Sequence, residues 1–402
     1  MKETDTYCKI ERRVMKPLFE GARDNPFRRT CMLMVTRDCN LNCTYCYESH
    51  KDKREMTFDL AREIILKEAE LVRASDKFRE LEIDFMGGEP LLNFHLIKSI
   101  VEWLAENPLS VPFVCYIITN GTLLDDEKRE WFRKYRKLVW MGVSVDGTEE
   151  MQEQNRGVKK SVIDLPFFHE VWPTQRFHMT VSQETLPNLS KGVLSLQRKG
   201  YPLEVALAQG IDWTLEDAVV FRNEMQKIGQ AYLADETLDP INLFERYLVT
   251  IDKADVPQLK FCGTGTNMNT YDVDGTRYGC HMFTPIVLGR DAIPADEINW
   301  NGREQNEDPR CTYCMLKTIC PTCPGFNYRY RGCIGKRDMR GCRMTLAGVL
   351  SVCEYQLSVL SKKQSYTDTE ARYAHAALET YKRLSKVDFP NADSPYEFKN
   401  SN

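Results

Sequence analysis

The sequence predicts an α/β protein: a partial (β/α)6 barrel of the TIM type, followed by a cysteine-rich C-terminal domain. Strand-like and helix-like segments alternate about six times before residue 235, which is the pattern of a parallel barrel. Polar residues share one face of several strands, as in a barrel whose interior holds a ligand. The 15 cysteines gather in two fields, four between Cys31 and Cys46 and nine between Cys262 and Cys353, which indicates a separate domain after the barrel.

The barrel elements follow from the apolar periodicity of the chain. Strands are expected at short runs of apolar residues, and helices where apolar residues recur every three to four positions. The expected strands span residues 31–36, 81–86, 113–119, 138–147, 176–182 and 205–210. The expected helices span 56–74, 91–106, 125–137 and 215–233, with two more at 354–364 and 369–386.

The second strand shows the polar face most clearly. Leu81, Ile83 and Phe85 share one face, whereas Glu82 and Asp84 share the other, because side chains alternate along a strand. The same alternation occurs at 143–146 and 177–182. Barrels of this type ordinarily fill their interior with branched apolar residues. Either a polar, charged ligand occupies this interior, or the true register differs, or water molecules fill the space.

Composition and charge limit the functions to consider. Of the 402 residues 28% are charged, and the net charge of -4 gives no electrostatic reason to expect nucleic acid as a partner. No run of about 18 apolar residues marks a membrane span, and no signal peptide is evident, so we expect a cytoplasmic protein with no membrane partner. The basic tract at 329–343 is either a solvated face or a shield for an anionic metal centre.

Three closely spaced cysteines follow the first strand. Cys39, Cys43 and Cys46 form the array CxxxCxxC, and in a reducing compartment such thiols are more often metal ligands or catalytic groups than disulfides. Three thiolates hold three irons of a 4Fe-4S cluster and leave the fourth iron open for another ligand. A structural zinc site is the alternative, but it requires four protein ligands, and only His50 offers a fourth nearby.

This array resembles that of the radical S-adenosylmethionine (radical SAM) enzymes, including the aromatic residue Tyr45 before the last cysteine. The resemblance implies that the amino and carboxylate groups of S-adenosylmethionine chelate the open iron of the cluster. It also implies that an electron from the reduced cluster cleaves the sulfonium to methionine and a 5'-deoxyadenosyl radical, inside a barrel that shields the radical from solvent. The three cysteines would be the cluster ligands.

Further motifs of this family follow in order, at the carboxyl ends of the predicted strands, where barrel enzymes keep their chemistry. GGEP, TNG and SVDG end the second, third and fourth strands, and QNRG follows them. In the family, GGEP receives the methionine amino group, SVDG meets the ribose and carboxylate, and QNRG matches a carboxylate position. The resemblance therefore implies that these residues bind the cofactor: Tyr45, Gly87, Gly88, Glu89, Pro90, Thr119, Asn120, Ser144, Asp146, Asn155 and Arg156.

The second cysteine field resembles the SPASM extension of the same superfamily, which carries two auxiliary 4Fe-4S clusters. The pattern matches, except that two residues instead of three separate Cys320 from Cys323. With the family's interleaved connectivity, the first auxiliary cluster would use Cys262, Cys280 and Cys323, and the second would use Cys311, Cys314, Cys320 and Cys342.

Two departures from sulfatase-maturing relatives bear on the activity. Those relatives have an additional cysteine shortly before the position of Cys262, which this chain lacks, so the first auxiliary cluster either has an open iron or is closed by Cys8, Cys333 or another group. They also have an aspartate base where this chain has His281, which is either a catalytic base or a hydrogen-bonding residue beside the cluster. Cys333 and Cys353 are otherwise spare, as free thiols or small buried residues.

The resemblance divides the chain into an N-terminal extension (1–29), a radical SAM partial barrel (30–235), a bridging segment (236–258), a SPASM domain with two auxiliary clusters (259–355) and a C-terminal helix and tail (356–402). The expected partners are a precursor peptide and a reductant such as flavodoxin or ferredoxin. Residues 1–29 are too few for the winged-helix module that binds leader peptides in many relatives. We therefore expect the barrel rim, the bridging segment, the SPASM region or a separate leader-binding protein to hold the leader.

Three functions of different kinds remain open. The motifs look most like those of enzymes that introduce an oxidative crosslink, a thioether or a carbon-carbon bond, into ribosomally made precursor peptides. An oxidative enzyme acting on a sulfatase residue or a small alcohol, as in anaerobic sulfatase maturases, is the second. A zinc-rich scaffold or nucleic-acid adaptor is the third, and brown colour with about a dozen irons in anaerobically purified protein would exclude it.

Overall fold

The computed structural model describes residues 27–246, 248–251, 262–300, 308–311, 314–320 and 322–386. Cys8, most of the expected N-terminal extension, part of the bridging segment and the tail after residue 386 lie outside these residues. The described chain forms two compact units. The first consists of residues within 22–179 and 262–302, and the described residues of the second lie within 180–261 and 303–402.

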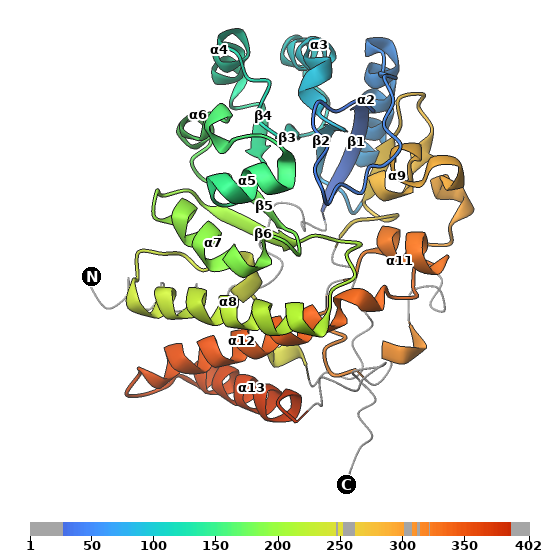
Figure 1. The fold of residues 1–402 in the computed structure, drawn as a ribbon. Coiled ribbons are helices and arrows are strands. Elements are labelled where there is room, and N and C mark those ends of the chain that lie inside the picture. The colour runs from blue at the N-terminus through green and yellow to red at the C-terminus, as the bar shows by residue number, and fades with distance from the viewer. Residues whose placement is uncertain are drawn as a thin grey trace. The chain divides into compact units, whose positions relative to one another are not determined.

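Six strands, each followed by at least one helix, succeed one another in the first part of the chain (Figure 1). These elements are β1 (Arg28–Thr36), α2 (Phe58–Arg73), β2 (Glu80–Gly87), α3 (Phe94–Glu106), β3 (Phe113–Thr119), α4 (Asp126–Tyr135), β4 (Val139–Val143), α5 (Glu149–Arg156), α6 (Leu165–Val171), β5 (Phe177–Val181), α7 (Leu189–Gln197), β6 (Leu203–Leu207) and α8 (Leu215–Ala234). Thr57 and Asp125 begin α2 and α4, because their side chains accept a backbone N–H of the first turn.

The first four strands form a parallel sheet in the order of the sequence. β1 pairs with β2, β2 with β3, and β3 with β4. β5 and β6 form a two-stranded sheet, and a parallel bridge between Ser144 and His178 joins the segment after β4 to β5. Parallel strands in chain order, with helices between them, are the arrangement of a partial barrel. The α/β fold class predicted from the sequence is confirmed.

β1 is buried along almost its whole length, from Thr30 to Thr36. It reads as a continuous apolar run because both of its edges are paired and both of its faces are covered. On β2, the polar residues Glu82 and Asp84 are also buried. Arg28 donates a hydrogen bond to Glu82 at 2.9 Å, and Thr30 donates one at 3.4 Å. Residues of β1 therefore provide partners for the polar face of β2.

A hairpin from beyond the barrel completes this sheet, and the sequence analysis did not predict it. β7 (Met268–Tyr271) pairs in parallel with β1, and β8 (Arg277–Tyr278) pairs antiparallel with β7. Glu68 of α2 is fully buried and accepts hydrogen bonds from Arg29 of β1 and Asn269 of β7, both at 3.1 Å. Directly after β1 and β7, Arg37 and Asp272 form a buried ion pair. The hairpin is therefore fixed to the strand that leads into the CxxxCxxC array.

Three long helices lie side by side in the second unit, with α12 (Cys342–Ser361) between α8 and α13 (Asp368–Leu384) (Figure 1). The expected helix at 354–364 is the second half of α12, so its predicted start was wrong. The missed half begins at a cysteine and continues through Leu346, Val349 and Leu350, which are buried in the core. α12 is apolar and long enough to cross a membrane, but 61% of its most apolar window is buried inside the protein. Two shorter helices, α9 (Pro285–Leu288) and α11 (Pro324–Arg331), belong to the second cysteine field.

A side chain closes the outer edge of β6. The Val205 N–H donates to Asn242 Oδ1 at 2.7 Å, and Asn242 Nδ2 donates to the Val205 carbonyl at 3.0 Å. The Ala208 N–H donates to the Val181 carbonyl of β5 at 2.8 Å. Backbone N–H groups that are an odd number of residues apart point to opposite edges of a strand, so β5 pairs with the other edge of β6. The asparagine amide therefore takes the place of a backbone partner at an edge that would otherwise be open.

Asn242→Ala should destabilise the second unit by about 1 to 2 kcal/mol, because two partly buried hydrogen bonds to the Val205 backbone are lost. Urea unfolding followed by circular dichroism would measure the change. Asn188→Ala is the matched control, since Asn188 is exposed and its side chain makes no capping hydrogen bond. Equal stability of the two variants would contradict the role assigned to Asn242.

Candidate active site

The CxxxCxxC array forms a loop directly after β1. Cys39, Cys43 and Cys46 are all partly exposed, and the Cys46 N–H donates to the Cys43 carbonyl at 3.1 Å. Burial raises the pKa of each thiol, that of Cys39 to about 11. Lys51 lowers the pKa of all three thiols, and Arg156 lowers those of Cys43 and Cys46. Both cations therefore lie where they stabilise thiolates.

The GGEP turn at the end of β2 packs directly against this loop. Gly88 and Glu89 donate their backbone N–H groups to the carbonyls of Thr36 and Asp38, at 3.3 Å and 2.9 Å. A Cβ atom on Gly87 would lie 2.5 Å from the Thr36 carbonyl oxygen. One on Gly88 would lie 2.4 Å from the Asp38 carbonyl oxygen. Only glycine allows the two backbones to approach so closely, so this turn fixes the start of the cysteine loop.

Glu89 connects the turn to the end of β3. Its buried carboxylate accepts hydrogen bonds from the Thr119 hydroxyl at 2.6 Å, the Asn120 N–H at 2.8 Å and the Leu91 N–H at 3.1 Å. Burial raises the pKa of this carboxyl group, whereas the three donors lower it. The Asn120 side chain in turn donates to Asn40 Oδ1 in the cysteine loop at 2.9 Å. The GGEP and TNG motifs therefore form one network with the CxxxCxxC array.

A second set of predicted residues meets around Asp146. The Asp146 carboxylate accepts hydrogen bonds from the Tyr45 hydroxyl at 2.7 Å, Arg156 Nε at 2.9 Å and Asn155 Nδ2 at 3.2 Å. The Thr44 N–H donates to the Asn155 carbonyl at 2.9 Å, which links this set to the cysteine loop. Burial raises the pKa of Tyr45, so its neutral hydroxyl is the donor. We call these four side chains, which come from three separate motifs, the Asp146 group.

Pro90 and Ser144 are positioned mainly through the backbone. Pro90 is buried and begins a short 3-10 helix (Pro90–Asn93) directly after Glu89. The Ser144 N–H donates to the Thr119 carbonyl at 2.9 Å. Both residues therefore lie at the strand ends where the sequence analysis expected them, next to residues of the Glu89 network.

Glu48 belongs to the same site, although the sequence analysis did not single it out. It lies two residues after Cys46, only 8% of it is exposed, and burial raises the pKa of its carboxyl group to about 8. It is near enough to raise the pKa of the Cys39 and Cys46 thiols. A lone glutamate has no spacing pattern, so its place directly after the array was the only signal in the sequence.

The donor set of the cysteine loop fits a 4Fe-4S cluster. Three thiols and two cations face one another there, as an anionic cluster requires. In the part of the chain that the structure describes, no three His, Cys, Asp or Glu side chains converge to hold a single metal ion. A four-iron cluster spreads its ligands more widely than one ion does. His50, the candidate fourth zinc ligand, instead hydrogen-bonds to the Ser49 hydroxyl at 3.2 Å and lies against Gly289.

Cys311, Cys314, Cys320 and Cys342 lie near one another in the second unit, around Arg337. Burial raises the pKa of Cys311 to about 11 and that of Cys314 to about 12; neighbouring thiols add to the shift and Arg337 opposes it. Arg337 is 4% exposed and donates to the Cys320 carbonyl at 3.4 Å. Within the basic tract, Arg337 therefore has the surroundings expected of a shield for an anionic centre.

The cysteines expected to hold the other auxiliary cluster are divided between the units. Cys262 is exposed and Cys280 is buried in the first unit, whereas Cys323 belongs to the second, where it immediately precedes α11. His281 Nε2 hydrogen-bonds to the Tyr47 hydroxyl at 3.0 Å. His281 therefore contacts the CxxxCxxC loop at Tyr47, the residue directly after Cys46.

The two spare cysteines differ in their surroundings. Cys353 is fully buried in α12 within an apolar core that includes Leu346 and Val349, and burial raises the pKa of its thiol to about 12. These are the surroundings of a small core residue. Cys333 is partly exposed and follows α11.

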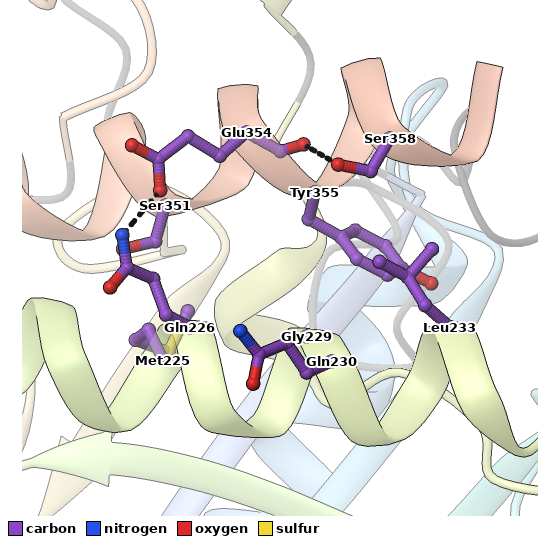
Figure 2. Close-up of a pocket in the computed structure, with 9 residues that line it drawn as sticks. All are labelled: Met225, Gln226, Gly229, Gln230, Leu233, Ser351, Glu354, Tyr355 and Ser358. Carbon is purple, nitrogen blue, oxygen red and sulfur yellow. Dashed lines mark hydrogen bonds between the residues drawn. The ribbon is translucent and has the colours of Figure 1, made fainter. Parts of the chain in front are cut away.

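A hollow of about 270 Å³ lies between α8 and α12, and its lining includes none of the predicted site residues (Figure 2). Gln226 Nε2 donates to the Glu354 carboxylate across it at 2.8 Å. Tyr355 and Leu233 line its other end in Figure 2. The hollow is therefore a gap in the packing of two helices, and the chemistry of the cysteine loop lies elsewhere.

Comparison with known proteins finds a family that matches the part of the chain that carries this site. Residues 33–164 match the sequence profile of the Radical SAM superfamily. An uncharacterized protein of Methanocaldococcus jannaschii is 38% identical over 119 residues, 29% of this chain and 38% of that protein. The radical SAM cyclopropyl synthase TigE of Paramaledivibacter caminithermalis is 24% identical over 240 residues, 54% of this chain and 49% of TigE. A serine-type anaerobic sulfatase-maturating enzyme of Bacteroides thetaiotaomicron is 31% identical over 153 residues, 36% of each chain. The matched region spans less than half of each relative.

Solved structures share the fold over most of the chain. The structure of anSMEcpe with bound AdoMet (S-adenosylmethionine) has a TM-score of 0.61 at 16% identity, over 88% of this chain and 98% of that one. Streptococcus suis SuiB bound to the precursor peptide SuiA has a TM-score of 0.51 at 16% identity, over 78% of this chain and 76% of SuiB. A match to this family implies S-adenosylmethionine and a 4Fe-4S cluster as cofactors. Residues 33–164, which carry the CxxxCxxC array and the motifs that follow it, are therefore similar to the Radical SAM superfamily.

Proposed function

We propose that this protein is a radical SAM peptide maturase, which abstracts hydrogen from a ribosomally made precursor peptide and forms an oxidative thioether or carbon-carbon crosslink. One observation carries the proposal: the cysteine loop, the Glu89 turn and the Asp146 group are connected into a single site by hydrogen bonds. The 4Fe-4S cluster and S-adenosylmethionine supply a 5'-deoxyadenosyl radical there when they are bound. The protein holds these groups, excludes water and presents the peptide.

Cys39, Cys43 and Cys46 would hold the cluster as thiolates. Burial favours their neutral form, so iron binding would release protons from them. Lys51 and Arg156 lower the cost of this deprotonation, because each places a positive charge beside the thiols. The same two cations would offset the negative charge of the bound cluster.

The turn and the Asp146 group would hold S-adenosylmethionine. The backbone carbonyls of Gly87 and Gly88 would receive the methionine amino group, and three hydrogen bonds hold Glu89 in one orientation beside them. Arg156 would offer its positive charge to the methionine carboxylate while Asp146 fixes its guanidinium. The remaining residues proposed to contact the cofactor are Tyr45, Pro90, Thr119, Asn120, Ser144 and Asn155.

We extend the proposal to an auxiliary 4Fe-4S cluster in the second unit, held by Cys311, Cys314, Cys320 and Cys342. Arg337 supports it, because its positive charge lies near Cys311 and Cys314 and lowers the pKa of both thiols, which favours the thiolates that a cluster requires. In this proposal the auxiliary cluster would accept the electron that remains after hydrogen abstraction. Cys262, Cys280 and Cys323 would hold the other auxiliary cluster, with an open iron or with Cys333 as the fourth ligand.

The domain limits and partners form part of the same proposal. The radical SAM barrel would span 30–235 and the SPASM domain 259–355, in a cytoplasmic enzyme reduced by a flavodoxin or ferredoxin. A peptide substrate is supported by the likeness in fold to SuiB, which was solved with its precursor peptide. The 24% identity to TigE, a radical SAM cyclopropyl synthase, supports radical SAM chemistry but not a particular substrate.

Oxidation of a sulfatase residue or a small alcohol is the second candidate. It is favoured by the 31% identity to a sulfatase-maturating enzyme and by the likeness in fold to anSMEcpe, also solved with the Cp18Cys peptide. His281 counts against it, because the sulfatase-maturing branch is expected to have an aspartate base at this position. The hydrogen bond between His281 and Tyr47 also favours a role in positioning the loop over one as a free base.

Cys43→Ala should abolish S-adenosylmethionine cleavage, because two thiolates do not hold the cluster. Cys311→Ala should keep 5'-deoxyadenosine formation and stop formation of the peptide product. Each variant should lose about four irons per chain in a chemical iron assay. Cys353→Ala is the matched control and should keep all its irons, since Cys353 lies in an apolar core. Unchanged cleavage by C43A would overturn the assignment of the radical cluster.

Gly88→Ala should lower 5'-deoxyadenosine formation about 100-fold, because the added Cβ would lie 2.4 Å from the Asp38 carbonyl and displace the cysteine loop. Single-turnover assays on reconstituted protein would measure the loss. Gly341→Ala is the steric control, since nothing lies within 4 Å of its Cβ position. Full activity of G88A would show that the close approach to Asp38 is not required.

Incubation of reconstituted enzyme with S-adenosylmethionine, dithionite and the short peptides encoded near its gene tests the substrate class. We expect one peptide to lose two hydrogens, about 2 Da by mass spectrometry, with one 5'-deoxyadenosine formed for each crosslink. 5'-Deoxyadenosine formed while every peptide stays unchanged would contradict the peptide proposal and favour a sulfatase or a small molecule.

A further inference from the structure

Glu48 is a largely buried residue, only 8% exposed, whose carboxylate accepts no hydrogen bond from the described residues. No cation of these residues lies within 4.0 Å of it. Its oxygen atoms are not among the fully buried atoms that lack a partner, so they keep some contact with solvent beside the cysteine loop. A cation or hydrogen-bond donor that replaced this water would therefore be favoured by the carboxylate charge.

Glu89 provides the contrast within the same site. It is more deeply buried, at 1% exposed, and three donors from the protein satisfy its carboxylate. The two carboxylates are close enough to influence each other's charge. The Glu89 carboxylate therefore has hydrogen-bond donors within the protein, whereas the Glu48 carboxylate has none among the described residues.

The surroundings of Glu48 show where its missing partner would lie. Its carboxylate is near enough to the Cys39 and Cys46 thiols to raise their pKa, and Glu89 is near enough to raise the pKa of Glu48. Lys51 is the nearest cation, but its Nζ donates to the Leu41 carbonyl at 3.0 Å. A cation or hydrogen-bond donor that binds beside the cluster, and that the described residues do not supply, would therefore pair with Glu48.

We propose that Glu48 binds the methionine part of S-adenosylmethionine, either as a hydrogen-bond acceptor for its amino group or as the counter-charge of its sulfonium. The inference rests on the proposed cofactor site and adds a residue to it. The chemistry fits, because S-adenosylmethionine places an N–H donor and a sulfonium cation close together and the Glu89 carboxylate is already occupied by three donors. A buried carboxylate facing a cation gives a stronger interaction than the same pair in water.

Glu48→Gln tests the proposal, because glutamine has nearly the same shape and carries no charge. Equilibrium dialysis of reconstituted enzyme should show about tenfold or weaker binding of S-adenosylmethionine to the variant. Its iron content and its EPR spectrum without S-adenosylmethionine should match those of the unmodified enzyme. Glu55→Gln is the matched control on the same segment, since Glu55 is exposed, and it should bind S-adenosylmethionine as the unmodified enzyme does.

S-adenosylhomocysteine separates the two possibilities, because it keeps the amino group and lacks the sulfonium charge. Weaker binding of both compounds to E48Q would assign Glu48 to the amino group. Weaker binding of S-adenosylmethionine alone would assign it to the sulfonium. Both results support the proposal.

Two results would overturn it. If E48Q binds S-adenosylmethionine as tightly as the unmodified enzyme, Glu48 has no role in cofactor binding. If E48Q has less iron or an altered EPR spectrum before any addition, Glu48 serves the cluster instead. Failure of the proposed function would give a different result from both. The enzyme would then modify no peptide, but E48Q would still bind S-adenosylmethionine more weakly, and this inference would stand.

Discussion

The close approach of two stretches of backbone is the constraint on which the candidate site depends. Where β2 ends, Gly87 and Gly88 lie against the carbonyl groups of Thr36 and Asp38, with no space for a side chain. This contact is made by the main chain, so its geometry does not depend on any rotamer. The loop that carries the three cysteines therefore inherits the rigidity of two adjacent parallel strands, and Glu89 extends the same order to β3.

Positive charge accompanies both groups of cysteines. Lys51 and Arg156 lie beside the CxxxCxxC thiols, and Arg337 lies beside Cys311 and Cys314. Burial favours neutral thiols in the protein without iron, whereas thiolates are required once iron binds. The cations reduce the cost of that change. In the proposed function they would therefore assist metal binding without touching the metal.

The sequence was sufficient to predict the barrel, because alternation on β2 and continuous apolar runs such as β1 follow directly from burial. The Asp146 group was also predictable, since its members lie in motifs that follow strand ends. The pairing of β7 with β1 was not, because a strand of four residues carries little periodicity and its partner is distant in the chain. Glu48 was missed because its significance depends on burial and on the absence of donors nearby, which no spacing pattern encodes.

The pairing of β7 with β1 has a consequence for biosynthesis. Thr270 of β7 lies 238 residues after Met32, its register partner in β1. On the ribosome, the most apolar strand of the barrel therefore keeps one unpaired edge until the hairpin has been made. An open edge of this kind is a template for incorrect pairing between chains. The nascent barrel thus depends on the cysteine-rich segment for its completion, which couples folding of the catalytic domain to synthesis of the region that follows it.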